Sequence, residues 1–150
     1  MIINILFGFI IPWIFGMWLY KKDKKIVLII APLGSVLSYT FNLLGHHLEL
    51  WSFKPILKTK QLSAFPLDIG LYPVISSYLI YLVQKRVANP YLILLIFSLV
   101  TTFLEYSALV FGGVSYNHDW NIFWTFWSYA LPYFIIYRFY IELKKIKVFN

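Results

Sequence analysis

Five long apolar runs constrain the fold of this chain more than any other feature. They lie at about residues 2–20, 26–45, 67–84, 91–113 and 121–142, and charged or turn residues separate them. Each run approaches the roughly 20 residues that a helix needs to cross about 30 Å of hydrocarbon. Apolar residues make up 61% of the 150 residues, which is more than a soluble domain of this size could bury. The sequence therefore predicts an integral membrane protein.

Helices are the expected form of these runs, because a backbone in lipid must satisfy its N–H and C=O groups within its own segment. We expect one all-α transmembrane domain, a bundle of five spans. Ten of the 13 basic residues follow the first run, lie between the third and fourth, or lie near the C-terminus. The positive-inside rule then predicts an outside N-terminus and an inside C-terminus. Because anionic lipid headgroups suit these lysines, no nucleic-acid partner is expected.

Polar residues recur every three or four positions in four of the runs, so each of the four helices should present one polar face. The first run has no such stripe and is expected to pack on the outside of the bundle. The stripes are Ser35, Ser38, Asn42 and His46; Asp68, Tyr72 and Ser76; Ser98, Thr102 and Glu105; and Asn121, Thr125 and Ser128. We expect them to meet around one outward-facing polar cavity. The predicted ligand-binding residues are Glu105, Asn42, Tyr72, Asp68, Thr125, Ser128 and Trp124.

Glu105 is the most informative of these residues, because it lies well inside the apolar run VTTFLEYSALV. A charge near the centre of a bilayer costs on the order of 3 kcal/mol. We expect Glu105 to face the bundle and to be protonated, hydrogen-bonded or hydrated, with Asn42, Tyr72 or a hydroxyl of the fifth span as its partner. Its role is either functional or structural.

Structural explanations exist for most of the other polar and aromatic residues. Ser, Thr and Asn side chains also join membrane helices, and Asp68 would suit the first turn of its helix as a cap. Trp and Tyr residues form two belts, as membrane interfaces select. The run WNIFWTFWSY is denser than anchoring requires, so part of it is a candidate groove for a lipid tail or an isoprenoid. The loop 46–66 is either a plain connector or a lid over the cavity.

Metal and nucleophile chemistry have weak support. The chain has no cysteine, and neither HExxH nor GxSxG occurs. His46 and His47 are adjacent rather than one helical turn apart, and the segment NHDW fits an ordinary polar turn. We expect neither a metal nor a cofactor; His46, His118 and Asp119 are the residues that a metal would use.

Three short motifs carry a family resemblance: AFPLDIGLYP at the third helix, FLEY in the fourth, and WNIFWTFW at the start of the fifth. In their order the chain resembles a family of uncharacterised, small five-span membrane proteins from Gram-positive spore-forming bacteria, best from Gly45 onward. The resemblance implies the bacterial plasma membrane and no established activity. It matches the family's acidic position in the fourth helix to Glu105 and its proline in the third to Pro73. Asp68 stands where other members place Glu.

Two classes of function fit the sequence. The first is a non-enzymatic membrane protein that binds a lipid or a membrane partner through the outer cavity. The second is a small membrane enzyme that acts on a lipid or isoprenoid headgroup, with Glu105 as general acid or base and Asp68 or a histidine assisting. A proton-coupled transporter is a weaker alternative. The lack of a catalytic motif favours the first class, and the oligomeric state stays open.

Overall fold

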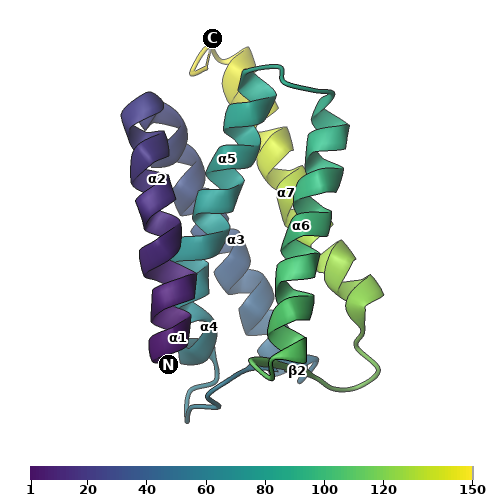
Figure 1. The fold of residues 1–150 in the computed structure, drawn as a ribbon. Coiled ribbons are helices and arrows are strands. Elements are labelled where there is room, and N and C mark those ends of the chain that lie inside the picture. The colour runs from purple at the N-terminus through teal and green to yellow at the C-terminus, as the bar shows by residue number, and fades with distance from the viewer. Residues whose placement is uncertain (150) are drawn as a thin grey trace.

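Between Met1 and Phe149, the residues that the structure describes, the chain forms five helices that pack as an up-and-down bundle (Figure 1). The structure is a computed structural model. Three helices are uninterrupted: α3 (Lys24–His47), α6 (Pro90–Val110) and α7 (Ile122–Lys145). The first helix comprises α1 (Ile2–Ile5), the π-helical segment η1 (Leu6–Ile10) and α2 (Ile11–Lys22). The third comprises α4 (Gln61–Pro66), the π-helical segment η2 (Leu67–Leu71) and α5 (Tyr72–Gln84).

Four of the described helices are long and apolar enough to cross a membrane: Ile2–Lys22, Lys24–His47, Gln61–Gln84 and Pro90–Val110. The helix α7 is as long as α3, but its Trp, Tyr and Pro residues give it a lower mean hydropathy. The predicted runs match these helices closely except for the third. That helix begins at Gln61 instead of Leu67, because the end of the polar loop is already helical.

The two ends of the bundle differ in character. The N-terminus, α4 and the strand β2 (Val114–Tyr116) lie at one end, and the C-terminus lies at the other (Figure 1). The strand β1 (Trp51–Phe53) pairs with β2, so this end is called the sheet end below. Ten of the 13 basic residues belong to the opposite end. The uneven distribution of positive charge seen in the sequence is therefore also present between the two ends of the bundle.

The two π-helical segments lie against each other, and each comes shortly before a proline. Pro12 and Pro73 lack an N–H, so they free the carbonyl groups of Gly8 and Ile69 four residues earlier. The Ile69 carbonyl accepts a hydrogen bond from Trp13 Nε1 at 2.8 Å. The Gly8 carbonyl lies so close to Gly70 that any Cβ there would overlap it. These contacts join the first helix to the third.

The main hydrophobic core lies among α3, α5, α6 and α7. Its fully buried side chains include Ile26, Ile30, Leu79, Ile80, Ile93 and Ile136, and Phe149 packs beside Tyr140 at its end. No residue of the first helix belongs to this core as far as residues 1–149 show. The first helix instead exposes most of its apolar side chains, so it packs on the outside of the bundle, as its lack of a polar stripe predicts.

The two-stranded sheet is a departure from the predicted all-α fold. Trp51 pairs with Tyr116, and Phe53 with Val114, in antiparallel register. Glu49, His118 and Asp119 adopt positive φ angles, which turn the chain into and out of the strands. The Trp51 ring packs directly on Gly45 of α3, where a Cβ would overlap it. The loop 46–66 and the connection after α6 thus form one ordered unit across the sheet end.

Candidate functional site

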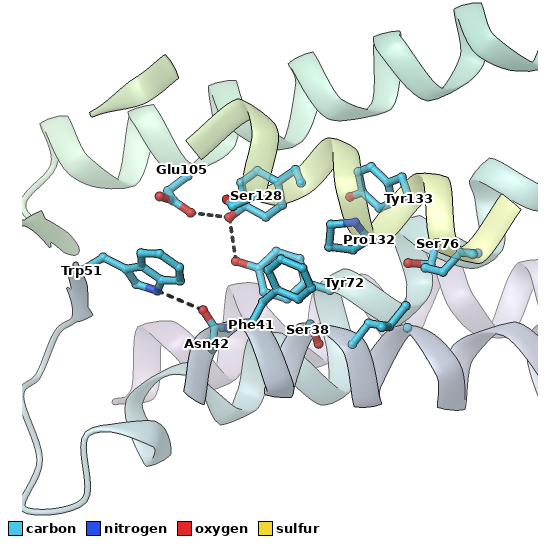
Figure 2. Close-up of a pocket in the computed structure, with 14 residues that line it drawn as sticks. Ser38, Phe41, Asn42, Trp51, Tyr72, Ser76, Glu105, Ser128, Pro132 and Tyr133 are labelled. Carbon is cyan, nitrogen blue, oxygen red and sulfur yellow. Dashed lines mark hydrogen bonds between the residues drawn. The ribbon is translucent and has the colours of Figure 1, made fainter. Parts of the chain in front are cut away.

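A cavity of about 40 Å³ lies between α3 and α7 in the half of the bundle nearer the sheet (Figure 2). The helix α5 contributes Tyr72 and Ser76, α6 contributes Glu105, and β1 contributes Trp51. The side chains and backbone from α3 and α7 that line it are Gly34, Leu37, Ser38, Phe41, Asn42, Ser128, Tyr129, Pro132, Tyr133 and Ile136. The volume is enough for about three water-sized groups at roughly 10–15 Å³ each.

Glu105 is the only carboxyl group in this wall within the described chain, and three hydroxyl groups surround it. Tyr116 donates to Oε1 at 2.7 Å, and Thr125 lies 3.4 Å from the same oxygen. Tyr129 donates to Oε2. Glu105 is therefore hydrogen-bonded on both oxygens, one of the three states that the sequence predicts for it.

Two chains of hydrogen bonds converge on the Glu105 carboxyl group. In the first, Trp120 Nε1 donates to Thr125 at 2.9 Å, and Thr125 Oγ1 lies 2.9 Å from the Tyr116 hydroxyl. In the second, the Tyr72 hydroxyl lies 3.0 Å from that of Tyr129. Because a hydroxyl has only one hydrogen, the donors of both chains point toward Glu105. In this arrangement Glu105 accepts hydrogen bonds from Tyr116 and Tyr129.

Local structure explains how these groups reach Glu105. Thr125 and Tyr129 are four residues apart, so they share the face of α7 that packs on α6. Tyr116 reaches Glu105 because the pairing of β2 with β1 holds it beside the end of α6. Burial and the nearby Glu105 carboxylate raise the pKa of the Tyr116 hydroxyl far above its ordinary value. Tyr116 therefore keeps its hydrogen and stays a donor.

Asp68 belongs to a second polar cluster, which shares Asn42 and Trp51 with the cavity wall. Its side chain is only 1% exposed, and Oδ1 accepts a hydrogen bond from Asn42 Nδ2 at 2.7 Å. Trp51 Nε1 donates to Asn42 Oδ1 at 3.1 Å. Oδ2 of Asp68 has no hydrogen-bond partner among residues 1–149. The interpretation of Asp68 as a helix cap is wrong, because its helix begins seven residues earlier, at Gln61.

The predicted ligand-binding residues divide into three groups. Glu105, Asn42, Tyr72 and Ser128 line the cavity. Asp68 and Thr125 are buried next to it without lining it. Trp124 lies outside the site: half of its surface is exposed, and its ring packs edge-on against Phe123. It was expected in the site, but one residue of helix turns it about 100° away from Thr125.

The partners of Glu105 also differ in part from those expected. The fifth helix does supply one of the predicted hydroxyls, on Thr125. Tyr72 bonds to the hydroxyl of Tyr129, which in turn bonds to Glu105. Asn42 contacts Asp68 instead of Glu105. Sequence reasoning missed Tyr116 and Tyr129, which make the two closest contacts. Tyr129 follows the Thr125 stripe at a spacing of four, which is the one signal that could have found it.

The histidines and Asp119 do not converge. His46 is buried, and neither of its ring nitrogens has a hydrogen-bond partner in the described part of the chain. His118 lies in an exposed turn with Nδ1 3.2 Å from the Glu49 carbonyl, and Asp119 is exposed beside it. Among residues 1–149, no three His, Asp or Glu side chains are placed to hold a metal ion.

Comparisons with protein-family models, with curated proteins and with solved structures found no match to this chain. The resemblance to five-span proteins of spore-forming bacteria therefore stays a prediction.

Proposed function

We propose that the chain is a multi-pass membrane protein that binds a lipid through the cavity between α3 and α7, without catalysing a reaction. The observation that carries the proposal is the partial exposure of the residues that line the cavity on α3 and α7. Leu37 and Phe41 of α3 and Ser128 and Pro132 of α7 line it and are neither fully buried nor fully exposed. The cavity therefore adjoins the outer surface of these two helices, where hydrocarbon would surround a membrane-spanning bundle.

The wall suits a molecule with a polar head and an apolar body. Glu105, Tyr129 and Ser128 lie near the sheet end of the cavity, and Leu37 and Ile136 lie toward the middle of the bundle. Exposed apolar residues of α3 and α7 continue outward from it, including Val36, Leu131 and Ile135. A lipid could place its headgroup beside Glu105 and its chains along this surface.

A binding role is better supported than catalysis. Both oxygens of Glu105 already accept hydrogen bonds from tyrosine hydroxyls, so side chains of the protein itself occupy the carboxyl group. Asp68, the expected assistant, does not line the cavity. Among the described residues no histidine lines the cavity either, so neither of the assistants expected for the enzyme alternative is placed in the wall with Glu105.

The proposal includes five spans with the sheet end outside. The helix α7 packs along α6 and, at 24 residues, is long enough to cross the hydrocarbon core. The concentration of lysines at the opposite end supports a cytoplasmic position for that end. The bacterial plasma membrane is the location that the family resemblance implies.

A cavity-filling variant tests lipid binding. Ser128→Leu would occupy the cavity without removing a bond to Glu105, because the Ser128 hydroxyl bonds to Thr125 O in its own helix. Ser107→Leu is the matched control, since Ser107 bonds to Phe103 O in the same way and does not line the cavity. In native mass spectra of protein gently extracted from bacterial membranes, we expect a stoichiometric lipid adduct on the wild type and on Ser107→Leu. Ser128→Leu should lose it.

Two results would overturn the proposal. One is a wild-type chain that carries no lipid under conditions that preserve the lipids of other membrane proteins. That result would direct the search to a membrane protein partner. The other is an adduct that Ser128→Leu retains in full, because the lipid would then bind somewhere other than the cavity.

A further inference from the structure

Most of the hydroxyl and N–H groups in the cavity wall donate their hydrogens to other groups of the protein. Tyr129 donates to Glu105, Tyr72 to Tyr129, and Ser128 to Thr125 O. The same is true of three further groups: Ser38 donates to backbone carbonyls, Tyr133 pairs with Thr101, and Trp51 donates to Asn42. Most polar groups of the wall therefore present only oxygen lone pairs to a ligand, and one of these groups is the carboxyl group of Glu105. A wall of acceptors selects a ligand that donates hydrogen bonds.

Glu105 also lacks a positive partner. The ion pairs of the described chain involve Glu49 with Lys60, and Glu142 with Lys145 and Arg138, all on the surface. Among residues 1–149, no Lys, Arg or His side chain lines the cavity. Glu105 is half-buried, and a carboxyl group that is partly removed from water without a cation beside it favours a positively charged ligand over a phosphate.

The aromatic rings in the wall and the volume of the cavity limit which cation the cavity can bind. Five aromatic side chains line the cavity, and their faces attract cations: Phe41, Trp51, Tyr72, Tyr129 and Tyr133. The space of about 40 Å³ holds about three water-sized groups, which is the size of an aminoethyl group. A trimethylammonium group is bulkier and has no N–H to donate to the oxygens of the wall.

We infer that the cavity binds the primary ammonium group of an aminoethyl headgroup, with Glu105 as its counter-ion. This inference rests on the proposed lipid-binding function and names the class of lipid. Phosphatidylethanolamine carries such a group. The ammonium would donate to Glu105 and to the hydroxyl oxygens near it, while the phosphate and the acyl chains stay outside the cavity.

Lipids that differ only in the headgroup test the inference. The purified protein is mixed with equal amounts of phosphatidylethanolamine and phosphatidylglycerol that have identical acyl chains, and native mass spectra record the adducts. Both lipids carry a phosphate, so their ratio isolates the amine. We expect about tenfold more phosphatidylethanolamine adduct, the ratio that one charge-assisted hydrogen bond supplies. Phosphatidylcholine in place of phosphatidylethanolamine should give no such preference.

Glu105→Gln should bring the ratio close to one, because it removes the counter-ion and keeps the shape of the side chain. Glu142→Gln is the matched control, since Glu142 is exposed at the opposite end of the chain's last helix, and it should keep the preference. If Glu105→Gln fails to assemble, Ser128→Leu serves in its place and should abolish the preferred adduct. Retention of the preference in an assembled Glu105→Gln variant would overturn the inference.

The remaining outcomes separate the inference from the proposed function. If the wild type retains both lipids equally, or prefers phosphatidylglycerol, the inference that the cavity recognises an amine is overturned. The proposed lipid binding would still stand. Retention of neither lipid would overturn the proposed function itself. Free ethanolamine is added to lipid-depleted protein as a last sample. If ethanolamine forms an adduct and phosphatidylethanolamine does not, the cavity binds a soluble amine. That result would overturn the inference that its ligand is a lipid headgroup.

Discussion

Glu105 shows how a carboxyl group can remain inside an apolar helix. Its charge would cost on the order of 3 kcal/mol near the centre of a bilayer, whereas a hydrogen bond to a charged group contributes about 1.5–3 kcal/mol. Bonds from Tyr116 and Tyr129 are therefore sufficient to offset the cost. The hydrogen bonds that Glu105 accepts in the described chain come from hydroxyl groups, and no basic side chain takes part in them.

Removing one donor should measurably weaken this network. We expect Tyr129→Phe to lower the free energy of unfolding by about 1–3 kcal/mol, because Glu105 loses a donor and Tyr72 loses its acceptor. Tyr106→Phe is the control, since Tyr106 is half exposed on the same helix as Glu105, and it should change stability by less than about 0.5 kcal/mol. Unfolding in mixed micelles with increasing denaturing detergent measures both. Equal effects of the two substitutions would contradict a special role for the Tyr129 hydroxyl.

At this scale the sequence predicts the position of Glu105 better than its contacts. Helical periodicity brings Glu105, Asn42, Tyr72 and Ser128 to one cavity, because the spacing of three or four residues fixes the face of a helix. It does not fix the rotation between neighbouring helices. Asn42 therefore meets Asp68 rather than Glu105, and Tyr129 makes the contact that was assigned to Tyr72.

The element that completes the site is the smallest one, the sheet of β1 and β2. Each strand has only three residues, so neither carries a periodic pattern that sequence reasoning could detect. The sheet nevertheless supplies Trp51 to the cavity wall and Tyr116 to Glu105. Its position depends on Gly45, which lets the Trp51 ring lie flat against α3.

A methyl group at Gly45 should displace the sheet. Gly45→Ala places a Cβ inside the Trp51 ring, and overpacking of this kind costs about 1–3 kcal/mol. Gly113→Ala adds the same methyl group at the sheet end, where its nearest neighbour is 3.4 Å away, and should be tolerated. Tryptophan fluorescence and detergent unfolding would report the difference. An unshifted emission spectrum together with unchanged stability in Gly45→Ala would contradict this packing.

At the scale of the whole molecule, the order of the helices follows from the sequence, whereas the π-helical segments do not. The apolar runs locate five helices, because the thickness of the hydrocarbon core sets the length of each run. The prolines at 12 and 73 predict kinks, but not what the freed carbonyls meet on the other helix. The Ile69 carbonyl accepts a hydrogen bond from Trp13, and the Gly8 carbonyl packs closely on Gly70. Such contacts depend on how two helices pack, and the periodicity of residues within one helix does not predict that packing.

Orientation can be measured directly because the chain has no cysteine. We expect a membrane-impermeant maleimide to label Asn117→Cys on intact cells, since Asn117 is exposed at the sheet end. Val87→Cys, exposed at the opposite end, should react only after the membrane is permeabilised. The reverse pattern would contradict the orientation. Labelling of both variants on intact cells would contradict a span between them, because α6 is the helix that separates these positions.

The most direct test of the central claim is the distance between Glu105 and a bound headgroup. Solid-state NMR can detect transfer between ¹⁵N-ethanolamine-labelled phosphatidylethanolamine and the carboxyl carbons of ¹³C-labelled glutamate in the reconstituted protein. The glutamates of the chain are Glu49, Glu105 and Glu142, and Glu105→Gln assigns the signal. We predict a cross-peak between the headgroup nitrogen and Glu105 that is absent in Glu105→Gln. A spectrum with contacts from the acyl chains to the protein but none from the headgroup nitrogen to Glu105 would contradict the claim.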